Sequence, residues 1–172
     1  MIIKRIHERM VEVAAMEKTM NVAAYIANKF LSTYGQKIDE MKLHKLMYFA
    51  QRESFIRKNE LLFPATFYGW KYGPILKEIR SAYREGTFEN ITPQKFEQDS
   101  SLTIVDSIFD DYAGKESWSL SRLTHGELSW KNSRVGIAQD DNSDRPMNNE
   151  DIKKDAERIR ERREMLAKLG LA

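Results

Sequence analysis

The strongest helix signal in the chain is IDEMKLHKLMYFAQRESF, residues 38–55. Asp39 can accept hydrogen bonds from the free N–H groups at the start of a helix, while Ile38 and Leu43 occupy the two positions of a hydrophobic staple. Apolar side chains then recur at helical spacing on two neighbouring faces, with Leu43, Leu46, Met47 and Ala50 on one and Tyr48 and Phe55 on the other. This pattern predicts a central helix that is covered on two sides.

Five other stretches have the apolar spacing of amphipathic helices. They are residues 2–17, residues 20–34 between the cap Thr19 and Gly35, residues 74–85 with Pro74 at the first helical position, residues 101–113 behind the cap Ser100 or Ser101, and residues 150–169. The last of these has a narrow apolar stripe among many charges and is expected at the periphery. Between them, the segment 87–100 is predicted to be irregular.

The stretch 61–73, LLFPATFYGWKYG, has a different character. Pro64 and two glycines disfavour a helix, and the aromatic residues with threonine favour extended backbone. We expect a short β-strand or hairpin with buried aromatic side chains; a platform for stacking nucleic-acid bases is the alternative interpretation. The whole chain is thus predicted to be mainly α, a compact helical domain of six to seven helices with this one strand or hairpin.

Residues 118–134 are predicted to form two short helices that meet at Thr124. Thr124 and Glu127 have the spacing of a capping box, in which the two residues satisfy each other's free backbone N–H groups. His125 would then lie at a helix N-terminus, where the backbone carries partial positive charge. A hydrolytic site with His125 and Glu127 is conceivable there, but no serine nucleophile elbow accompanies them, and capping is a sufficient role for the Thr124 and Glu127 pair.

The composition limits the classes of protein to consider. A length of 172 residues fits one domain, and 28 Lys and Arg against 26 Asp and Glu leave a net charge of +2, too small for a general nucleic-acid-binding field. The absence of cysteine excludes disulfides, thiolate catalysis and cysteine-based metal sites. No apolar run is long enough to span a membrane, so we expect a cytoplasmic protein without a membrane partner.

Few residues carry recognisable chemistry. The histidines His7, His44 and His125 are isolated in the sequence and lack the spacing of a metal site. His44 is expected at the surface or edge of its helix. The glycine-containing segment 69–73 is too short for a phosphate-binding loop. We therefore expect no cofactor, no metal site and no enzymatic activity.

Three ordered blocks of the sequence resemble the Panacea domain, the SocA-like antitoxin domain that also occurs in phage-associated proteins of the Gep type. The blocks are MKLHKLMYFAQ at 41–51, FYGWKYGPILKEI at 67–79 and LSRLTHGELSWKNSR at 120–134. They resemble the family's approximate KL-x-KLLYYAQ helix, its W-x-YGP turn and its late block with threonine, histidine, glutamate, tryptophan and arginine. The matches in the first block are Lys42, Leu43, Lys45, Leu46, Tyr48, Ala50 and Gln51. The resemblance covers about residues 20–135.

The resemblance implies a non-enzymatic antitoxin that neutralises a cognate toxin, typically encoded by the adjacent gene, through direct contact. The candidate partner-binding residues are Trp70, Tyr72, His125, Trp130 and Arg134. Packing of the scaffold is the equal alternative for these side chains. Gly73 and Pro74 are expected to shape the turn, and Thr124 and Glu127 to be structural.

Two other functions stay open beside neutralisation by binding. One family member acts as an adaptor that delivers its toxin to a Clp-type protease. Small helical proteins often bind nucleic acid, although a net charge of +2 argues against this function here. A homodimer is an alternative assembly. Within the chain, we expect an accessory helix at 1–18, a Panacea-like helical domain at 19–137, and at 138–172 a polar connector with a charged C-terminal helix that packs on the domain.

Overall fold

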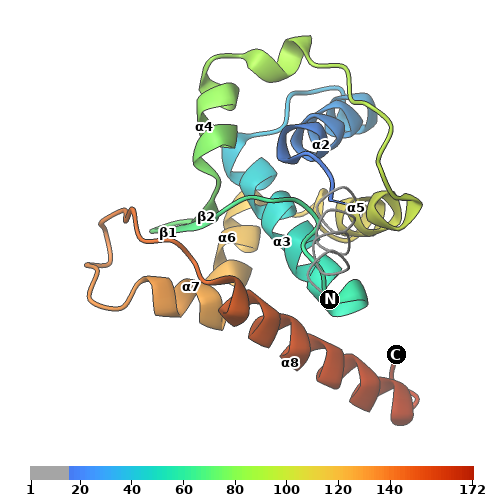
Figure 1. Ribbon diagram of the computed structural model, residues 1–172, viewed down its shortest axis with the longest axis vertical. Helices are drawn as coiled ribbons and strands as arrows, with labels where there is room; N and C mark the ends of the chain where they lie inside the picture. Colours follow the sequence, from blue (N-terminus) through green and yellow to red (C-terminus); the bar gives the residue numbers. More distant parts are fainter. Residues whose placement is uncertain (1–15) are drawn as a thin grey trace, which may run out of the picture.

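The structure is a computed structural model that describes residues 16–172, so the helix predicted from residue 2 lies almost entirely outside the described residues. The described part of the chain forms seven α-helices, one 3-10 helix and one two-stranded antiparallel hairpin (Figure 1). The prediction of a mainly α domain with six to seven helices and one hairpin is therefore confirmed.

The elements follow one another along the chain with short connections, apart from the segments 59–67 before β1, 91–98 before α5 and 134–148 before α8. The α-helices are α2 (Thr19–Tyr34), α3 (Glu40–Lys58), α4 (Lys77–Arg84), α5 (Asp99–Tyr112), α6 (Ser117–His125), α7 (Leu128–Ser133) and α8 (Asn149–Lys168). The hairpin consists of β1 (Tyr68–Trp70) and β2 (Gly73–Ile75), and the 3-10 helix η1 (Thr87–Asn90) follows α4.

Helix α3 lies in the middle of the molecule, as predicted (Figure 1). Its N-terminus is capped by Asp39, whose carboxylate accepts a hydrogen bond from the backbone N–H of Lys42 at 2.8 Å. Every residue from Leu43 to Phe55 is buried, so the helix is covered on all sides rather than on two. The buried Gln51 is satisfied by the backbone of the 62–63 segment, because its amide donates to the Phe63 carbonyl and accepts from the Leu62 N–H.

Three predicted helix starts are wrong. α2 begins at Thr19 itself, so Lys18 takes the N-cap position. α5 begins at Asp99, ahead of the predicted caps at Ser100 or Ser101. Pro74 does not begin a helix; it lies in β2 opposite Gly69, and α4 begins only at Lys77. A proline is tolerated there because both strands of a two-stranded sheet are edge strands, which need not donate at every residue.

Helix α8 is peripheral only over its second half. In its first half, Ile152 and Ala156 are fully buried and the helix packs against α3. Farther along, Arg163 holds α8 to the central helix through two ion-pair contacts with the Glu53 carboxylate, at 2.9 and 3.0 Å. The helix then projects from the body of the molecule, as Figure 1 shows. The division into residues 1–18, 19–137 and 138–172 stays a prediction.

The predicted capping box of Thr124 with Glu127 is wrong. Thr124 lies within α6, and its hydroxyl donates to the carbonyl oxygen of Ser121 at 2.7 Å. Glu127 does occupy the N-cap position of α7, but its side chain makes no capping bond. Its carboxylate instead pairs with the guanidinium of Arg52 on α3.

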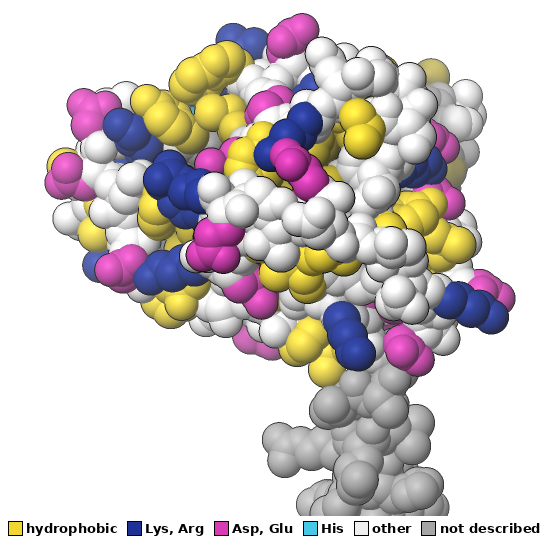
Figure 2. All heavy atoms as spheres, turned by 90° about the horizontal axis from the view of Figure 1, so that it is seen from above, with side chains coloured by type: hydrophobic (Ala, Val, Ile, Leu, Met, Phe, Trp, Pro, Cys, Tyr) yellow, Lys and Arg dark blue, Asp and Glu magenta, His cyan; other side chains and the backbone are white. Residues whose placement is uncertain are grey.

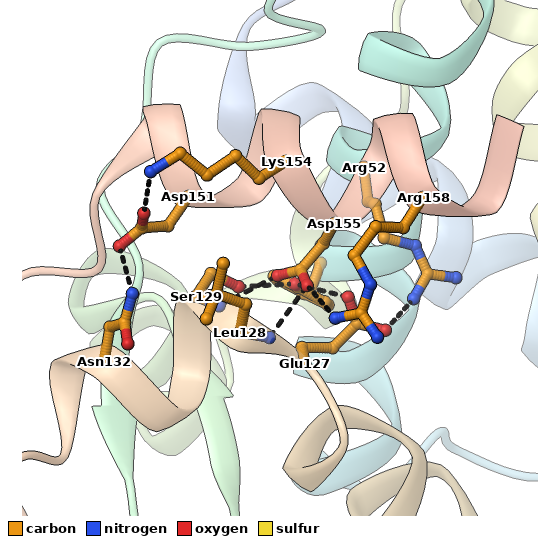
Figure 3. A network of polar contacts seen from close by, with 10 residues as sticks. Arg52, Glu127, Leu128, Ser129, Asn132, Asp151, Lys154, Asp155 and Arg158 are labelled. Carbon is orange, nitrogen blue, oxygen red and sulfur yellow. Dashed lines mark hydrogen bonds and ion pairs between the residues drawn. The ribbon is translucent and has the colours of Figure 1, made fainter. Parts of the chain in front are cut away.

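The cap of α7 comes from α8. Asp155 accepts hydrogen bonds from the backbone N–H groups of Leu128, at 2.7 Å, and Ser129, at 2.9 Å (Figure 3). Its side chain is 2% exposed, and Arg158 lies 3.9 Å away. A carboxylate at a helix N-terminus is favoured by the free N–H groups and by the helix dipole. Helix α8 therefore fixes the position of α7, which in turn contacts the hairpin.

Candidate partner-binding site

The hairpin brings the three sequence blocks together. Its two strands pair with Tyr68 opposite Ile75 and Trp70 opposite Gly73, so Lys71 and Tyr72 form the turn. The hairpin packs against α3 from the first block and against α6 and α7 from the third. Residues that are far apart in the sequence thus support one short turn.

Gly73 is required by both its backbone and its surroundings. Its φ of +105° lies in the region that favours glycine. A Cβ atom there would stand 2.4 Å from the hydroxyl of Thr124 and 2.6 Å from Cε of Lys45. The neighbouring Pro74 accepts a hydrogen bond from the Lys45 amine at 3.2 Å. The expectation that Gly73 and Pro74 shape the turn agrees with this geometry.

The first strand is held equally closely by α7. A Cβ atom on Gly69 would stand 1.9 Å from the hydroxyl of Ser133. One residue on, the indole Nε1–H of Trp130 donates to the carbonyl oxygen of Trp70 at 2.9 Å. The interpretation of the sequence missed Gly69; a glycine inside a strand pattern is the signal that could have indicated such a close approach.

Arg134 binds backbone rather than solvent. It is 8% exposed, and its guanidinium donates to the carbonyl oxygens of Gly69, Ala138, Gln139 and Asp141, at distances of 2.6 to 3.1 Å. Charge-assisted bonds of this kind are among the stronger hydrogen bonds in proteins. Arg134 therefore ties β1 to the connector that leads to α8, and its contact with a partner stays a prediction.

His125 lies at the C-terminus of α6, so its predicted place at a helix N-terminus is wrong. Its ring stacks on Trp130 with a centroid separation of 4.1 Å, and burial lowers its pKa. Glu127 has different partners, the guanidinium of Arg52 and the hydroxyl of Tyr48, and burial raises its pKa. The two side chains are thus engaged separately and show no acid and base pairing.

Tyr72 is the candidate residue that faces solvent. It is 45% exposed at the tip of the hairpin and meets Trp118 of α6, which is 57% exposed, edge to face at 5.0 Å. We call these two residues the aromatic pair. The carbonyl of Tyr72 accepts a hydrogen bond from the Ser121 hydroxyl at 2.7 Å, which fixes the turn on α6. Trp118 was missed from sequence, although it stands between two serines and outside the apolar stripe.

A cavity of ≈310 Å³, the hairpin cleft, opens beside the aromatic pair. Its lining comes from α3, the hairpin, α4 and the connector, and consists of Glu40, Met41, His44, Lys45, Trp70, Lys71, Tyr72, Ile75, Arg80 and Asn142. The expectation that His44 lies at a helix surface is wrong, since it is 1% exposed. Burial lowers the pKa of Lys45 to about 7, while Asp39 and Glu40 act in the opposite direction.

A second cavity, of ≈240 Å³, lies between α2, α4 and η1. The face of the molecule that Figure 2 shows carries hydrophobic side chains interspersed with charged side chains of both signs. Lys37 and Glu89, paired at 3.0 Å, belong to the lining. None of the five candidate partner-binding residues lines this cavity, so we take the hairpin cleft and the aromatic pair as the candidate site.

A family model described as "Antitoxin SocA-like, Panacea domain" matches residues 43–131, just over half of the chain. The chain belongs to this family. The matched segment of the Panacea domain begins in α3 and ends in α7, and it includes the hairpin, the aromatic pair and most of the cleft. Arg134 lies three residues beyond it. No curated protein and no solved structure matches the chain.

Within residues 16–172, no group of three or more histidine, aspartate or glutamate side chains is arranged to hold a metal ion. No helix in the same range combines the length and the apolar character that crossing a membrane requires.

Proposed function

We propose that this Panacea domain is an antitoxin that neutralises a toxin protein by binding it directly at the hairpin. The observation that carries the proposal is the convergence of the family's sequence blocks on one turn, with Tyr72 exposed at its tip and Trp118 of α6 exposed beside it. Tryptophan and tyrosine are over-represented among the residues that dominate binding energy in protein interfaces. An exposed edge-to-face pair of the two is a suitable anchor for a partner.

The hairpin is held in place before any partner binds. Hydrogen bonds reach it from Lys45 on α3, Ser121 on α6, Trp130 on α7 and Arg134 behind α7. A surface that is already ordered loses less conformational entropy on association. This supports neutralisation by a rigid surface, with no bond made or broken in the antitoxin.

The candidate residues then fall into two roles. Tyr72 contacts the toxin together with Trp118. Trp130, His125 and Arg134 hold the hairpin, because their side chains are turned to the scaffold. Trp70 lies between these roles, since its carbonyl is part of the scaffold while its side chain lines the cleft. The toxin is expected to be the product of the adjacent gene.

The test is growth rescue with the adjacent gene product under an inducible promoter. Co-expressed wild-type chain is expected to restore growth and to co-purify with the toxin. The double variant Tyr72→Ala with Trp118→Ala is expected to fold normally and to lose both properties. Leu31→Ala, on α2 and 52% exposed, is the matched control for removing a large exposed apolar side chain, and it is expected to rescue as wild type does.

Cells that lack Clp proteases separate direct neutralisation from delivery to a protease. Direct binding predicts rescue in these cells with the toxin still present at full level. Rescue that disappears together with the protease would show that the chain is a proteolytic adaptor. A toxin that stays fully active whenever the wild-type chain is present would contradict both functions.

A further inference from the structure

The segment between α7 and α8 is much longer than the connection of these two helices requires. α7 ends at Ser133 and α8 begins at Asn149, which leaves residues 134–148, here called the α7–α8 loop. The helices are already in contact at the base of this loop, where the side-chain amide of Asn132 donates to the carboxylate of Asp151 at 3.0 Å. The loop therefore leaves the helix pair and returns to it, as an Ω-loop does, and loops of this kind are frequently functional.

The excursion leads along β1 to the turn of the hairpin (Figure 1). Near its end, the backbone N–H of Met147 donates to the carbonyl oxygen of Phe67 at 2.7 Å, and a β-bridge joins the loop to β1. Farther out, the side-chain oxygen of Asn142 accepts a hydrogen bond from the backbone N–H of Lys71 at 3.3 Å. The loop is thus attached to the same turn that carries the aromatic pair.

Arg134 orders the loop from inside. Its guanidinium donates to the carbonyl oxygens of Ala138, Gln139 and Asp141 in the loop and to that of Gly69 in β1. These bonds involve only backbone acceptors, so they hold the chain and leave the loop side chains free. A segment that is already ordered loses less conformational entropy when a partner binds.

The loop adds little to the core. Its buried residues are Arg134, Ser143 and Met147, of which Met147 alone is apolar. Three consecutive side chains at its far end are exposed, and none of them has a hydrogen bond or an ion pair with another residue of 16–172. These are Gln139, Asp140 and Asp141, which we call the loop tip. Ordered loops with free polar side chains on a rigid scaffold commonly carry binding residues.

The loop tip adjoins the proposed toxin site. Asn142, the next residue along the chain, lines the hairpin cleft together with Tyr72 of the aromatic pair. Protein interfaces typically combine an apolar centre with a polar rim. The aromatic pair has the character of the centre, and the loop tip has the character of the rim.

The charges of the loop favour a cationic group on the partner. Asp144 is already paired with Lys77 of α4 at 2.7 Å, and Arg145 donates to the carbonyl oxygen of Val135. Asp140 and Asp141 have no such partner, and their carboxylates only accept hydrogen bonds. Bonds from lysine or arginine to a carboxylate are charge-assisted and stronger than neutral ones.

We propose that the loop tip is a second contact of this domain with the toxin, in which Gln139, Asp140 and Asp141 accept hydrogen bonds from basic side chains beside the aromatic pair. The inference rests on the proposed function for the identity of the partner. It extends the toxin-binding surface from the hairpin and α6 to a segment outside the family match at residues 43–131.

Hydrogen exchange of the full chain, with and without the adjacent gene product, tests whether the loop is covered. We expect slower exchange on toxin binding for the backbone N–H groups of residues 139–142 and of the hairpin turn, while the exposed segment 92–95 is unchanged. A protected turn with an unprotected loop tip would overturn the inference. Protection of the loop in the free chain that rises with its concentration would assign the loop to self-association and would also overturn it.

Charge removal tests the chemistry of the contact. The variant Asp140→Ala with Asp141→Ala is expected to weaken toxin binding by about fivefold or more, chiefly through slower association, and the loss should shrink in high salt. The matched control is Asp110→Ala with Asp111→Ala, an exposed adjacent pair on α5 that removes the same charge. Urea unfolding should be unchanged in the loop variant, because its two side chains make no contact within residues 16–172.

The outcomes separate the inference from the proposed function. Equal losses in the loop variant and its control would show a general charge effect and would contradict the loop contact. Wild-type affinity in the loop variant would overturn the inference and leave the antitoxin function standing. Failure of the wild-type chain to bind the toxin would overturn the proposed function and the loop contact together.

Discussion

Trp130 donates its indole N–H to the carbonyl oxygen of Trp70 at 2.9 Å, and so joins α7 to the strand that lines the hairpin cleft. Trp130 is partly buried and its ring is also stacked on His125. The residue thus helps α7 to hold β1, whereas α3 contacts β2.

Trp130→Phe is expected to lower the free energy of unfolding by about 1–2 kcal/mol, because it removes this hydrogen bond while keeping an aromatic ring against His125. Urea unfolding measures the change. The control is Trp118→Phe, at a site that is 57% exposed, for which we expect a change within about 0.5 kcal/mol. Equal effects of the two substitutions would contradict the role given to Trp130.

The buried amine of Lys45 gives a pH-dependent stability. Its pKa falls from 10.5 to about 7 on folding because burial disfavours the charged form. Between these two values the unfolded chain holds a proton that the folded chain has lost, so the stability of the folded state rises with pH. Lys45→Met removes this proton while keeping a chain of similar length.

The free energy of unfolding of wild type minus that of Lys45→Met is therefore expected to increase by about 1.4 kcal/mol per pH unit between pH 8 and pH 9.5. Urea unfolding of both proteins across this range measures the slope. Titrations shared by the two proteins cancel in the difference. A difference that does not change with pH would show that Lys45 keeps its proton in the folded state.

Comparing alanine substitutions at Gly73 and Gly35 separates the cost of steric crowding from the cost of a positive φ. Both have positive φ, +105° and +68°, but a Cβ atom would collide with Lys45 and Thr124 only at Gly73, and meets nothing within 4 Å at Gly35. Gly35→Ala is expected to cost about 1 kcal/mol and Gly73→Ala about 3 kcal/mol or more. Thermal unfolding compares the two. Similar costs would mean that the hairpin is not packed tightly on α3 and α6.

Asp155 of α8 joins this helix to α7 through two hydrogen bonds. Asp155→Ala leaves the N–H groups of Leu128 and Ser129 without their acceptor, and we expect a loss of about 2 kcal/mol. Glu157→Ala, at an exposed site on the same helix, is expected to have little effect on urea unfolding. If both variants were equally stable, α8 would not be what fixes the start of α7.

Features that depend on neighbouring residues in the sequence could be predicted. The start of α3 is one, because Asp39 caps the backbone only three residues away. The end of α2 at Gly35 is another, since the glycine adopts a positive φ at the helix C-terminus. The presence of a hairpin also followed from local composition, although its second strand extends through Pro74.

Features that depend on partners distant in the sequence could not be predicted from it. Thr124 and Glu127 have the spacing of a capping box, yet the cap of α7 is Asp155, which comes from a different helix. Glu127 instead forms an ion pair with Arg52. His44 is buried because the segment after β2 folds over it and donates to its ring. The three sequence blocks contain the residues that form the hairpin and the elements that pack against it. Which of their side chains stay exposed depends on the packing of α6 and α7.

The most direct test of the central claim is a titration of the purified toxin, the product of the adjacent gene, with the purified full chain in the absence of any protease. We predict that toxin activity falls to zero at a defined molar ratio, and that the Tyr72→Ala and Trp118→Ala double variant fails to inhibit at the same ratio. A toxin that keeps its full activity in a large excess of folded wild-type chain would contradict the account.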